Sequence, residues 1–311
     1  MNSEKHYNTL TEYYKEKYNK KVAKIALNGN FTCPNKDGRK GYGGCTYCSK
    51  LGSGDTAGNV NLSFQEQFRE IKEKINKKWP ECYYIPYLQA NSNTYADVNT
   101  LKQIYNEILA IDDNIVEFAI ATRPDCFNEE IYEYLNELNK KVTLSIELGL
   151  QTSNEVTSQI INRCSTNEEF IEAVTKLRSY NINVVVHIIN GLPHETEIDM
   201  LNTIDFINNL DIQGIKFHSL LILKDTLMYK QYLENPFPIL SLEEYVKITT
   251  KQIARLNPNI IIHRLAADGV FDDIYTPKWP IKKLVVMNEI DKLLRKENIY
   301  QGDDFKSNHH R

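Results

Sequence analysis

The chain has 311 residues, of which 41% are hydrophobic and 25% are charged, a composition typical of a folded globular protein. No apolar run approaches the roughly 18 residues that a membrane-spanning helix needs, which argues against a membrane protein. The polar N-terminus lacks the apolar core of a signal peptide, so we expect a cytoplasmic protein. The net charge of −4 argues against a protein that coats nucleic acid, although local basic patches remain compatible with it.

Short apolar stretches and amphipathic stretches alternate along the chain. The apolar stretches are rich in Val, Ile, Leu and aromatic residues, as buried parallel strands are. They predict strands at 22–27, 83–88, 116–121, 142–148, 183–189 and 214–221. The amphipathic stretches predict helices at 63–78, 97–111, 128–138, 167–180 and 195–210.

Repetition of strand and helix six times predicts right-handed βαβ units and a parallel sheet, which is an α/β fold. Six units fit either a doubly wound sheet or a partial TIM-type barrel, and composition does not choose between them. After Leu223 the rhythm changes, and we expect a helix at 242–256, a strand at 259–263 and a helix at 281–297. The predicted organisation is an N-terminal helix at 1–20, a core at 21–225 and a C-terminal α/β extension at 226–311.

Three of the six cysteines, Cys33, Cys45 and Cys48, lie close together directly after the first predicted strand. Their loop therefore lies at the carboxyl ends of the strands, where α/β barrels carry their chemistry. Three thiolates can hold a four-iron cluster and leave one iron open, whereas a structural zinc site wants four ligands. The spacing favours the iron–sulfur cluster. The alternative is a zinc loop that a distant His or Cys completes.

The spacing from Cys33 to Cys48 is C-x11-C-x2-C, and the sequence resembles the radical S-adenosylmethionine (SAM) superfamily, specifically its YhcC/YtqA-like (MnmL-type) family. The usual superfamily spacing, C-x3-C-x2-C, has a shorter first gap. The resemblance continues through TRPDC (122–126), SIELGLQT (145–152), HIINGLPHET (187–196), IKFHSLLILKDT (215–226), HRLAADG (263–269) and PKW (277–279). It implies a partial (β/α)6 TIM-type barrel with a [4Fe–4S] cluster and SAM, which together generate a 5′-deoxyadenosyl radical.

The resemblance also implies contacts to SAM. The glycine-rich turn that usually follows the second strand is replaced here by QANSNT (89–94). Arg163 resembles an arginine that pairs with the SAM carboxylate, and His187 stands where some relatives carry a ribose-binding aspartate. Glu147 has the alternative of a structural ion pair. The expected cofactor-binding residues are Asn91, Ser92, Glu147, Gln151, Arg163 and His187.

Cys126 follows the third predicted strand and is a candidate catalytic residue that would donate a hydrogen atom. The alternative is a buried thiol with no part in the reaction. His218 and His263 lie in apolar strands, where histidines are more often core residues than ligands.

For the substrate, the resemblance implies tRNA, with a wobble uridine converted from its carboxymethylaminomethyl form to its aminomethyl form. An anticodon-loop base is single-stranded and can be splayed into the mouth of a barrel. The reductant would be a flavodoxin or a ferredoxin. The alternatives are a radical SAM enzyme acting on a small molecule or a protein, and a zinc-stabilised binding protein. Candidate contacts to the phosphate backbone are Lys17, Lys20, Lys21, Lys24, Lys36, Arg39, Lys40, Lys278, Lys282 and Lys283.

Overall fold

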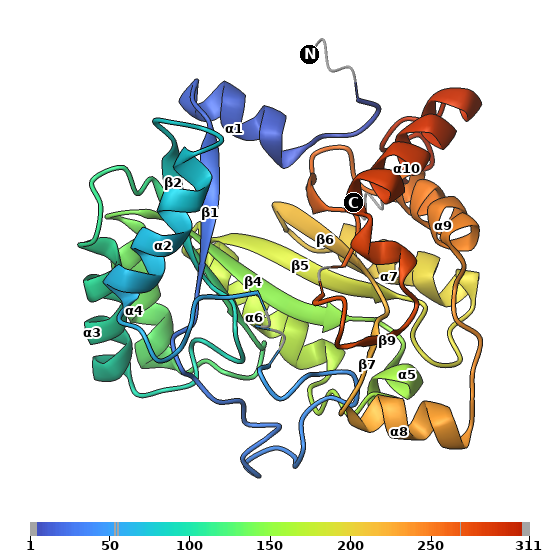
Figure 1. The fold of residues 1–311 in the computed structure, drawn as a ribbon, viewed down its shortest axis with the longest axis horizontal. Helices are drawn as coiled ribbons and strands as arrows, with labels where there is room; N and C mark the ends of the chain where they lie inside the picture. Colours follow the sequence, from blue (N-terminus) through green and yellow to red (C-terminus); the bar gives the residue numbers. More distant parts are fainter. Residues whose placement is uncertain (1–4, 53, 55, 268, 307–311) are drawn as a thin grey trace.

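The computed structural model describes residues 5–52, 54, 56–267 and 269–306. Within these residues, seven parallel strands form one curled sheet in the order β1-β2-β3-β4-β5-β6-β8 (Figure 1). Each strand up to β6 lies beside its predecessor, whereas a doubly wound sheet would reverse its strand order midway. The predicted partial (β/α)6 barrel is therefore confirmed. The strands are β1 (Val22–Leu27), β2 (Tyr83–Leu88), β3 (Glu117–Thr122), β4 (Thr143–Gln151), β5 (Asn183–Asn190), β6 (Gly214–Ser219) and β8 (Ile261–Arg264).

Amphipathic helices cover the outer face of the sheet and connect its strands (Figure 1). Their ends lie within two residues of the predicted bounds, and Ser63 and Glu66 form a capping box at the start of α2. Among the described residues, no helix combines the length and the apolar character that crossing a membrane requires. The helices are α2 (Phe64–Asn76), α3 (Val98–Leu109), α4 (Glu129–Asn139), α6 (Asn167–Ser179) and α7 (Glu197–Asn208).

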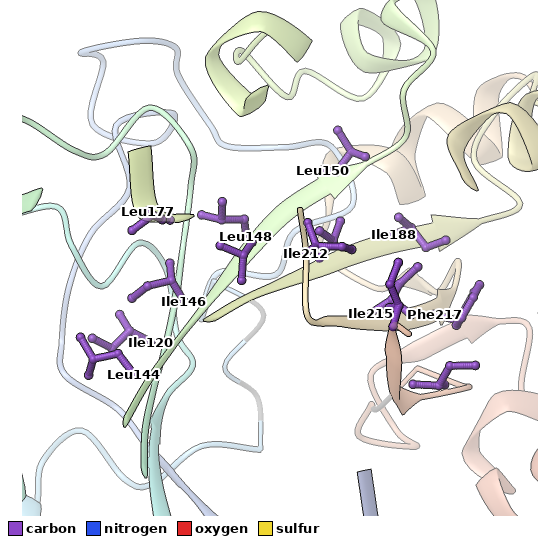
Figure 2. Close-up of a cluster of buried hydrophobic side chains, with 14 of the residues drawn as sticks. Ile120, Leu144, Ile146, Leu148, Leu150, Leu177, Ile188, Ile212, Ile215 and Phe217 are labelled. Atoms are coloured by element: carbon purple, nitrogen blue, oxygen red, sulfur yellow. The ribbon is translucent and has the colours of Figure 1, made fainter. Parts of the chain in front are cut away.

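Successive residues of the central strands point alternately to the helices and to the interior of the barrel. On β4, Ile146 and Leu148 belong to the core under the helices, whereas Glu147 and Gly149 line an interior pocket. Figure 2 shows the helix-facing set: Ile120 of β3 and Ile146 and Leu148 of β4 lie on the same side of the view as Leu177 of α6. Ile188 of β5 and Ile215 and Phe217 of β6 lie on the other side. This alternation separates an apolar core from a polar interior within the same strands.

The C-terminal extension contributes to the barrel sheet, because β8 pairs with β6 in parallel. Four short elements were not predicted, since each has too few residues for a periodic pattern. They are α5 (Glu155–Ile160), α8 (Leu227–Glu234), β7 (Ile222–Leu223) and its antiparallel partner β9 (Ile274–Thr276). The other elements of the extension are α9 (Leu242–Arg255), the 3-10 turn η1 (Trp279–Ile281) and α10 (Lys283–Glu297). The domain boundaries at 20 and 225 stay predictions.

The N-terminal helix α1 (Leu10–Tyr18) lies at the end of the barrel where the strands begin, opposite the cysteine loop (Figure 1). Its Tyr14, Lys17 and Tyr18 all bond to the carboxylate of Glu117, the first residue of β3. The helix therefore packs at the amino ends of the strands, opposite the end of the barrel that carries the cysteine loop.

Candidate active site

One pocket opens at the carboxyl ends of the strands. Its walls come from the cysteine loop after β1, the ends of β2 to β6, and the segment that follows β8. Cys33, Cys45 and Cys48 all line it. So do all six residues that the sequence predicts as SAM contacts, which the chain brings together from positions 91 to 187.

The cysteine loop is held by turns of its own and by the segment after α5. The Lys36 N–H donates to Cys33 O (2.8 Å), and the Cys48 N–H donates to Cys45 O (3.0 Å). Across the loop, Asn35 Nδ2 donates to Asn162 O (2.6 Å), and Asn162 Nδ2 donates to Gly44 O (2.8 Å). Reciprocal asparagine bonds of this kind fix where the thiols lie before any ligand binds.

The thiols lie close enough to influence one another. Burial raises the pKa of the Cys45 thiol to about 11, and the nearby Cys48 and Cys33 raise it too, while Arg123 lowers it. A thiolate at this position needs positive charge beside it, which the irons of a cluster would supply. The cysteines were predicted as ligands, but Arg123 was missed.

Arg123 is held in place from two sides. Its Nε and Nη2 donate to the two oxygens of Asp125 (2.8 Å each), and its Nη1 donates to Arg163 O (2.8 Å). These bonds fix the guanidinium in the wall of the pocket, paired with Asp125 and close enough to act on the thiols of Cys45 and Cys33. The signal was available in the TRPDC motif, because an arginine two residues before an aspartate at a strand end can form this fork.

The donor set fits an iron–sulfur cluster better than a single metal ion. Within the described ranges, no three His, Cys, Asp or Glu side chains converge tightly enough to bind one ion. A cubane spreads its thiolates over several irons, so it needs three cysteines around a pocket instead of three at one point. Cys164 lies against the loop near Gly41, but its thiol bonds to Asn162 Oδ1 (3.1 Å) and does not line the pocket.

Asn91 and Ser92 form the turn after β2, next to the cysteine loop. Asn91 has a φ of 58°, its Nδ2 donates to Phe31 O (2.9 Å), and its Oδ1 accepts from Lys36 Nζ (3.1 Å). Ser92 is buried, and its N–H donates to Thr32 O (3.2 Å). The turn is therefore bonded to the loop that carries the cysteines, and the predicted contact of both residues with SAM stays a prediction.

Arg163 is buried, and its guanidinium donates hydrogen bonds to other groups of the protein. Its Nη1 donates to the carbonyls of Leu150 and Thr152 (2.7 Å each), and its Nε donates to Ser165 O (2.8 Å). These bonds clamp the end of β4, where Gln151 adopts a φ of 66°. The geometry suits a residue that positions Gln151, and direct pairing with a carboxylate of SAM stays a prediction.

Glu147 lies at the centre of a buried ion network. Its Oε1 accepts from Lys24 Nζ (2.6 Å), and its Oε2 contacts Lys216 Nζ and His187 Nε2 (2.8 Å for the imidazole). Burial acts to raise the pKa of Glu147, but Lys216, Lys24 and His187 hold it well below its usual value. The carboxylate is thus anionic with both oxygens engaged, and the structural ion pair considered for it is present. Its predicted SAM contact stays a prediction.

Two lysines of this network were not recognised as interior residues. Lys24 was assigned to a phosphate-binding surface, but its Nζ lies inside the barrel against Glu147 and 5.0 Å from the ring centroid of Tyr87. Lys216 was not singled out, although a lysine inside the apolar run IKFHS of a buried strand needs an acidic partner. The rings of His187 and His218 stack with their centroids 5.1 Å apart. Burial lowers the pKa of His187 to about 4, so its imidazole is neutral.

Cys126 does not line the pocket. Its side chain is buried, and burial raises its thiol pKa to about 12, with Asp125 adding to the shift. Its role as a hydrogen-atom donor stays a prediction, and no contact of the Cys126 side chain with the pocket supports it.

Comparison with known proteins agrees with this geometry. Residues 37–207 match the Radical SAM superfamily, and residues 212–296 match the Radical_SAM C-terminal domain. The chain is 43% identical to the uncharacterized protein YtqA of Bacillus subtilis (strain 168), over 98% of this chain and 94% of that protein. It is 31% identical to protein YhcC of Escherichia coli (strain K12), over 91% of this chain and 90% of that protein.

More distant proteins share the barrel. The archaeal Elp3 of Methanocaldococcus infernus superposes with a TM-score of 0.71 at 16% identity, covering 91% of this chain and 64% of that chain, a likeness of fold alone. A tRNA-2-methylthio-N(6)-dimethylallyladenosine synthase of Thermotoga petrophila is 24% identical over 60% of this chain and 42% of its own length. With a superfamily match across most of the barrel and two relatives aligned over nearly their whole length, this chain belongs to the radical SAM superfamily, in the group of YtqA and YhcC.

Proposed function

We propose that this radical SAM enzyme modifies tRNA, converting the carboxymethylaminomethyl group of a wobble uridine to an aminomethyl group. The superfamily uses a [4Fe–4S] cluster and SAM, which supply a 5′-deoxyadenosyl radical that takes a hydrogen atom from the substrate. The observation that carries the proposal is the shared pocket, which gathers the three cysteines and the six predicted SAM contacts. Cys33, Cys45 and Cys48 would hold the cluster.

The protein's own part is to bind and orient. The turn at Asn91 and the cysteine loop are bonded to each other, so an adenosyl group bound between them would have fixed neighbours. At the far end of the barrel, α1 is bonded to the start of β3 through Glu117.

Support for tRNA comes from a relative and from the chemistry of the group removed. The Thermotoga petrophila protein that matches over 60% of this chain is named for a tRNA modification. Hydrogen abstraction from a carbon beside an amine weakens a bond that acid–base catalysis alone handles poorly. An unpaired anticodon base reaches a pocket at a barrel mouth without the cost of opening a duplex.

The set of candidate phosphate contacts is smaller than the sequence suggested. Lys24 is paired with Glu147 inside the barrel, and Lys17 is paired with Glu117 at the amino ends of the strands. Arg39 belongs to the cysteine loop, at the end of the barrel where the pocket opens. Its guanidinium carbon lies 5.7 Å from the ring centroid of Tyr95. We propose that the RNA backbone runs along this side.

The test is tRNA-dependent formation of 5′-deoxyadenosine by the iron-loaded enzyme under anaerobic conditions, with reduced flavodoxin or ferredoxin as electron donor. We expect tRNA isolated from a strain that lacks the protein to stimulate the reaction, and tRNA from the complemented strain to do so much less. Nucleoside mass spectrometry of the same tRNAs should show a higher ratio of the carboxymethylaminomethyl form to the aminomethyl form in the deletion strain. Equal ratios in the two strains would contradict the tRNA assignment and point to a small-molecule or protein substrate.

A further inference from the structure

The long gap between Cys33 and Cys45 places a buried amide against one of the three cysteines. Asn35, two residues after Cys33, is 0% exposed, and its Nδ2 donates to Cys45 Sγ at 3.6 Å. Sulfur is larger than oxygen, so a hydrogen bond to a thiol or thiolate is longer than one to a carbonyl. The Asn35 amide therefore touches a sulfur that the cluster would use as a ligand.

The orientation of this amide follows from its other neighbours. Its Nδ2 also donates to Asn162 O at 2.6 Å and reaches Arg163 O at 3.5 Å. If the amide were turned over, its oxygen would face these two carbonyl oxygens, which cannot donate. The NH2 group of Asn35 thus faces Cys45 and the segment after α5.

The two N–H groups of this amide have three acceptors within reach. One N–H is taken by Asn162 O, the nearest of the three. Arg163 O already accepts from Arg123 Nη1 at 2.8 Å. The second N–H of Asn35 is therefore left for Cys45 Sγ. A thiolate accepts a hydrogen bond more strongly than a neutral thiol, so this bond would strengthen when Cys45 holds a cluster.

The backbone of the cysteine loop keeps the amide in place. The Lys40 N–H donates to Pro34 O (2.8 Å), and the Gly44 N–H donates to Asn35 O (2.8 Å). A Cβ atom at Gly41 would lie 2.3 Å from Asn35 Oδ1, so the lack of a side chain there lets the loop pack against the amide. The donor is thus held in its position before a cluster binds.

We propose that Asn35 acts through Cys45 to raise the reduction potential of the cluster. Reduction transfers one electron from the flavodoxin or ferredoxin to the cluster, which gains one negative charge. An N–H group aimed at a ligand sulfur stabilises the more negative state, so the hydrogen bond favours reduction. The inference concerns the cluster of the superfamily and does not depend on tRNA as the substrate.

The test is the midpoint potential of the anaerobically reconstituted protein without SAM, measured by a redox titration that follows the EPR signal of the reduced cluster. Asn35→Leu keeps the branched shape of the side chain and removes the donor. We expect the equilibrium constant for reduction to fall about fivefold, which is about 40 mV for a one-electron couple. An unchanged potential in a variant with wild-type iron and sulfide content would overturn the proposal.

A matched control separates the hydrogen bond from the anchoring of the loop. Asn162→Gly removes the bond from Asn162 Nδ2 to Gly44 O but keeps Asn162 O and the contact of Asn35 with Cys45. Glycine also accepts the φ of 53° at this position. We expect a potential close to that of the wild type. A shift as large as that of Asn35→Leu would assign the effect to loop anchoring and overturn the proposal.

A measurement on the natural side chain decides the question if Asn35→Leu does not retain a cluster. Protein labelled with 15N in the asparagine side-chain amides and reduced without SAM should show a nitrogen coupling to the cluster by pulsed EPR. The coupling should persist in Asn91→Gly, which removes an asparagine amide that lines the pocket. Absence of the coupling, or its loss in Asn91→Gly, would overturn the role of Asn35.

Discussion

Two buried glutamates on neighbouring strands show how differently the two ends of this barrel use the same side chain. Glu117, at the start of β3, accepts from Lys17 (2.6 Å), Tyr18 (2.8 Å) and Tyr14 (3.1 Å), all of which belong to α1. Glu147, within β4, is bonded by residues of three other strands, β1, β5 and β6. One glutamate docks a helix, and the other ties together the interior wall of the barrel.

The difference lies in what surrounds each carboxylate. The Lys17 side chain is 32% exposed, so water shares its charge, and two tyrosines complete the site without adding charge. Around Glu147 the Lys216 side chain and the carboxylate are nearly or fully buried, and two lysines, Lys24 and Lys216, share the one carboxylate. Water partly screens the first ion pair, whereas the buried network depends on its single carboxylate for the stability of both lysines.

The largest effect should come from the cysteine loop at the open end. Cys45→Ala should abolish the visible absorption of the reconstituted cluster and the formation of 5′-deoxyadenosine, because two thiolates no longer enclose the cube. The melting temperature of the iron-free protein should stay close to that of the wild type, since the loop lies outside the strand–helix core. Cys164→Ala, which changes a thiol against the same loop but outside the pocket, is the control and should keep both signals. A Cys45→Ala protein that fails to fold without iron would show that the loop is structural.

The next effect compares the two glutamates directly. Glu147→Gln should lower the free energy of unfolding by about 3–5 kcal/mol, because Lys216 and Lys24 lose their buried counter-charge. Glu117→Gln should cost about 1–3 kcal/mol, because Lys17 can turn to water. Urea unfolding of the two variants measures both values. Equal losses would contradict the distinction between a partly exposed ion pair and a buried one.

A third glutamate, Glu195, sharpens the comparison, because it is half-buried without a lysine or arginine partner among the described residues. Burial raises the pKa of Glu195 to about 7, Asp199 raises it further, and a bond from Thr152 opposes the shift. The unfolded chain releases this proton at lower pH than the folded chain does. The stability that Glu195 contributes is therefore present below its usual pKa and is lost as pH rises through about 7.

Glu195→Gln removes this dependence. The unfolding free energy of the variant, relative to the wild type, should rise by about 2 kcal/mol between acidic and mildly alkaline pH. Denaturant titrations at a series of pH values measure the difference, with Glu197→Gln, an exposed neighbour, as the control. A constant difference across that range would contradict a raised pKa.

The smallest effect belongs to the docking of α1. Tyr14→Phe removes one of the three bonds to Glu117 and should lower the unfolding free energy by about 1 kcal/mol. Formation of 5′-deoxyadenosine should be unchanged, because the hydroxyl lies at the end of the barrel opposite the cysteine loop. A loss of activity greater than the loss of stability would show that the two ends communicate.

The periodic parts of the fold were predictable from sequence. The ranges 22–27 and 83–88 were predicted as strands and are the observed β1 and β2. The elements α5, α8, β7 and β9 were missed, because two to eight residues give too little periodicity to read. The seventh barrel strand was predicted as a strand at 259–263, but its place beside β6 depends on long-range pairing that no local pattern encodes.

The sequence predicted the cysteines and the other candidate residues of the pocket, but it did not predict which charged side chains pair with one another. The close spacing of Cys45 and Cys48 and the motifs around Glu147 and His187 identified residues that do share a pocket. Lys24 was misplaced because lysines are usually exposed, and its burial depends on Glu147, which is more than 120 residues away along the chain. Sequence indicates which side chains are unusual, and only the fold shows which of them neutralise one another.

The pairing of β8 with β6 has a consequence for exchanging parts between relatives. Arg264 ends β8 and stands in the pocket wall, so the C-terminal segment supplies part of the pocket that the three cysteines also line. The barrel and its C-terminal extension are therefore not interchangeable modules. A chimera that joins the barrel of one relative to the extension of another would keep the cysteine loop of the first relative. Its pocket would then combine that loop with wall residues from the second relative.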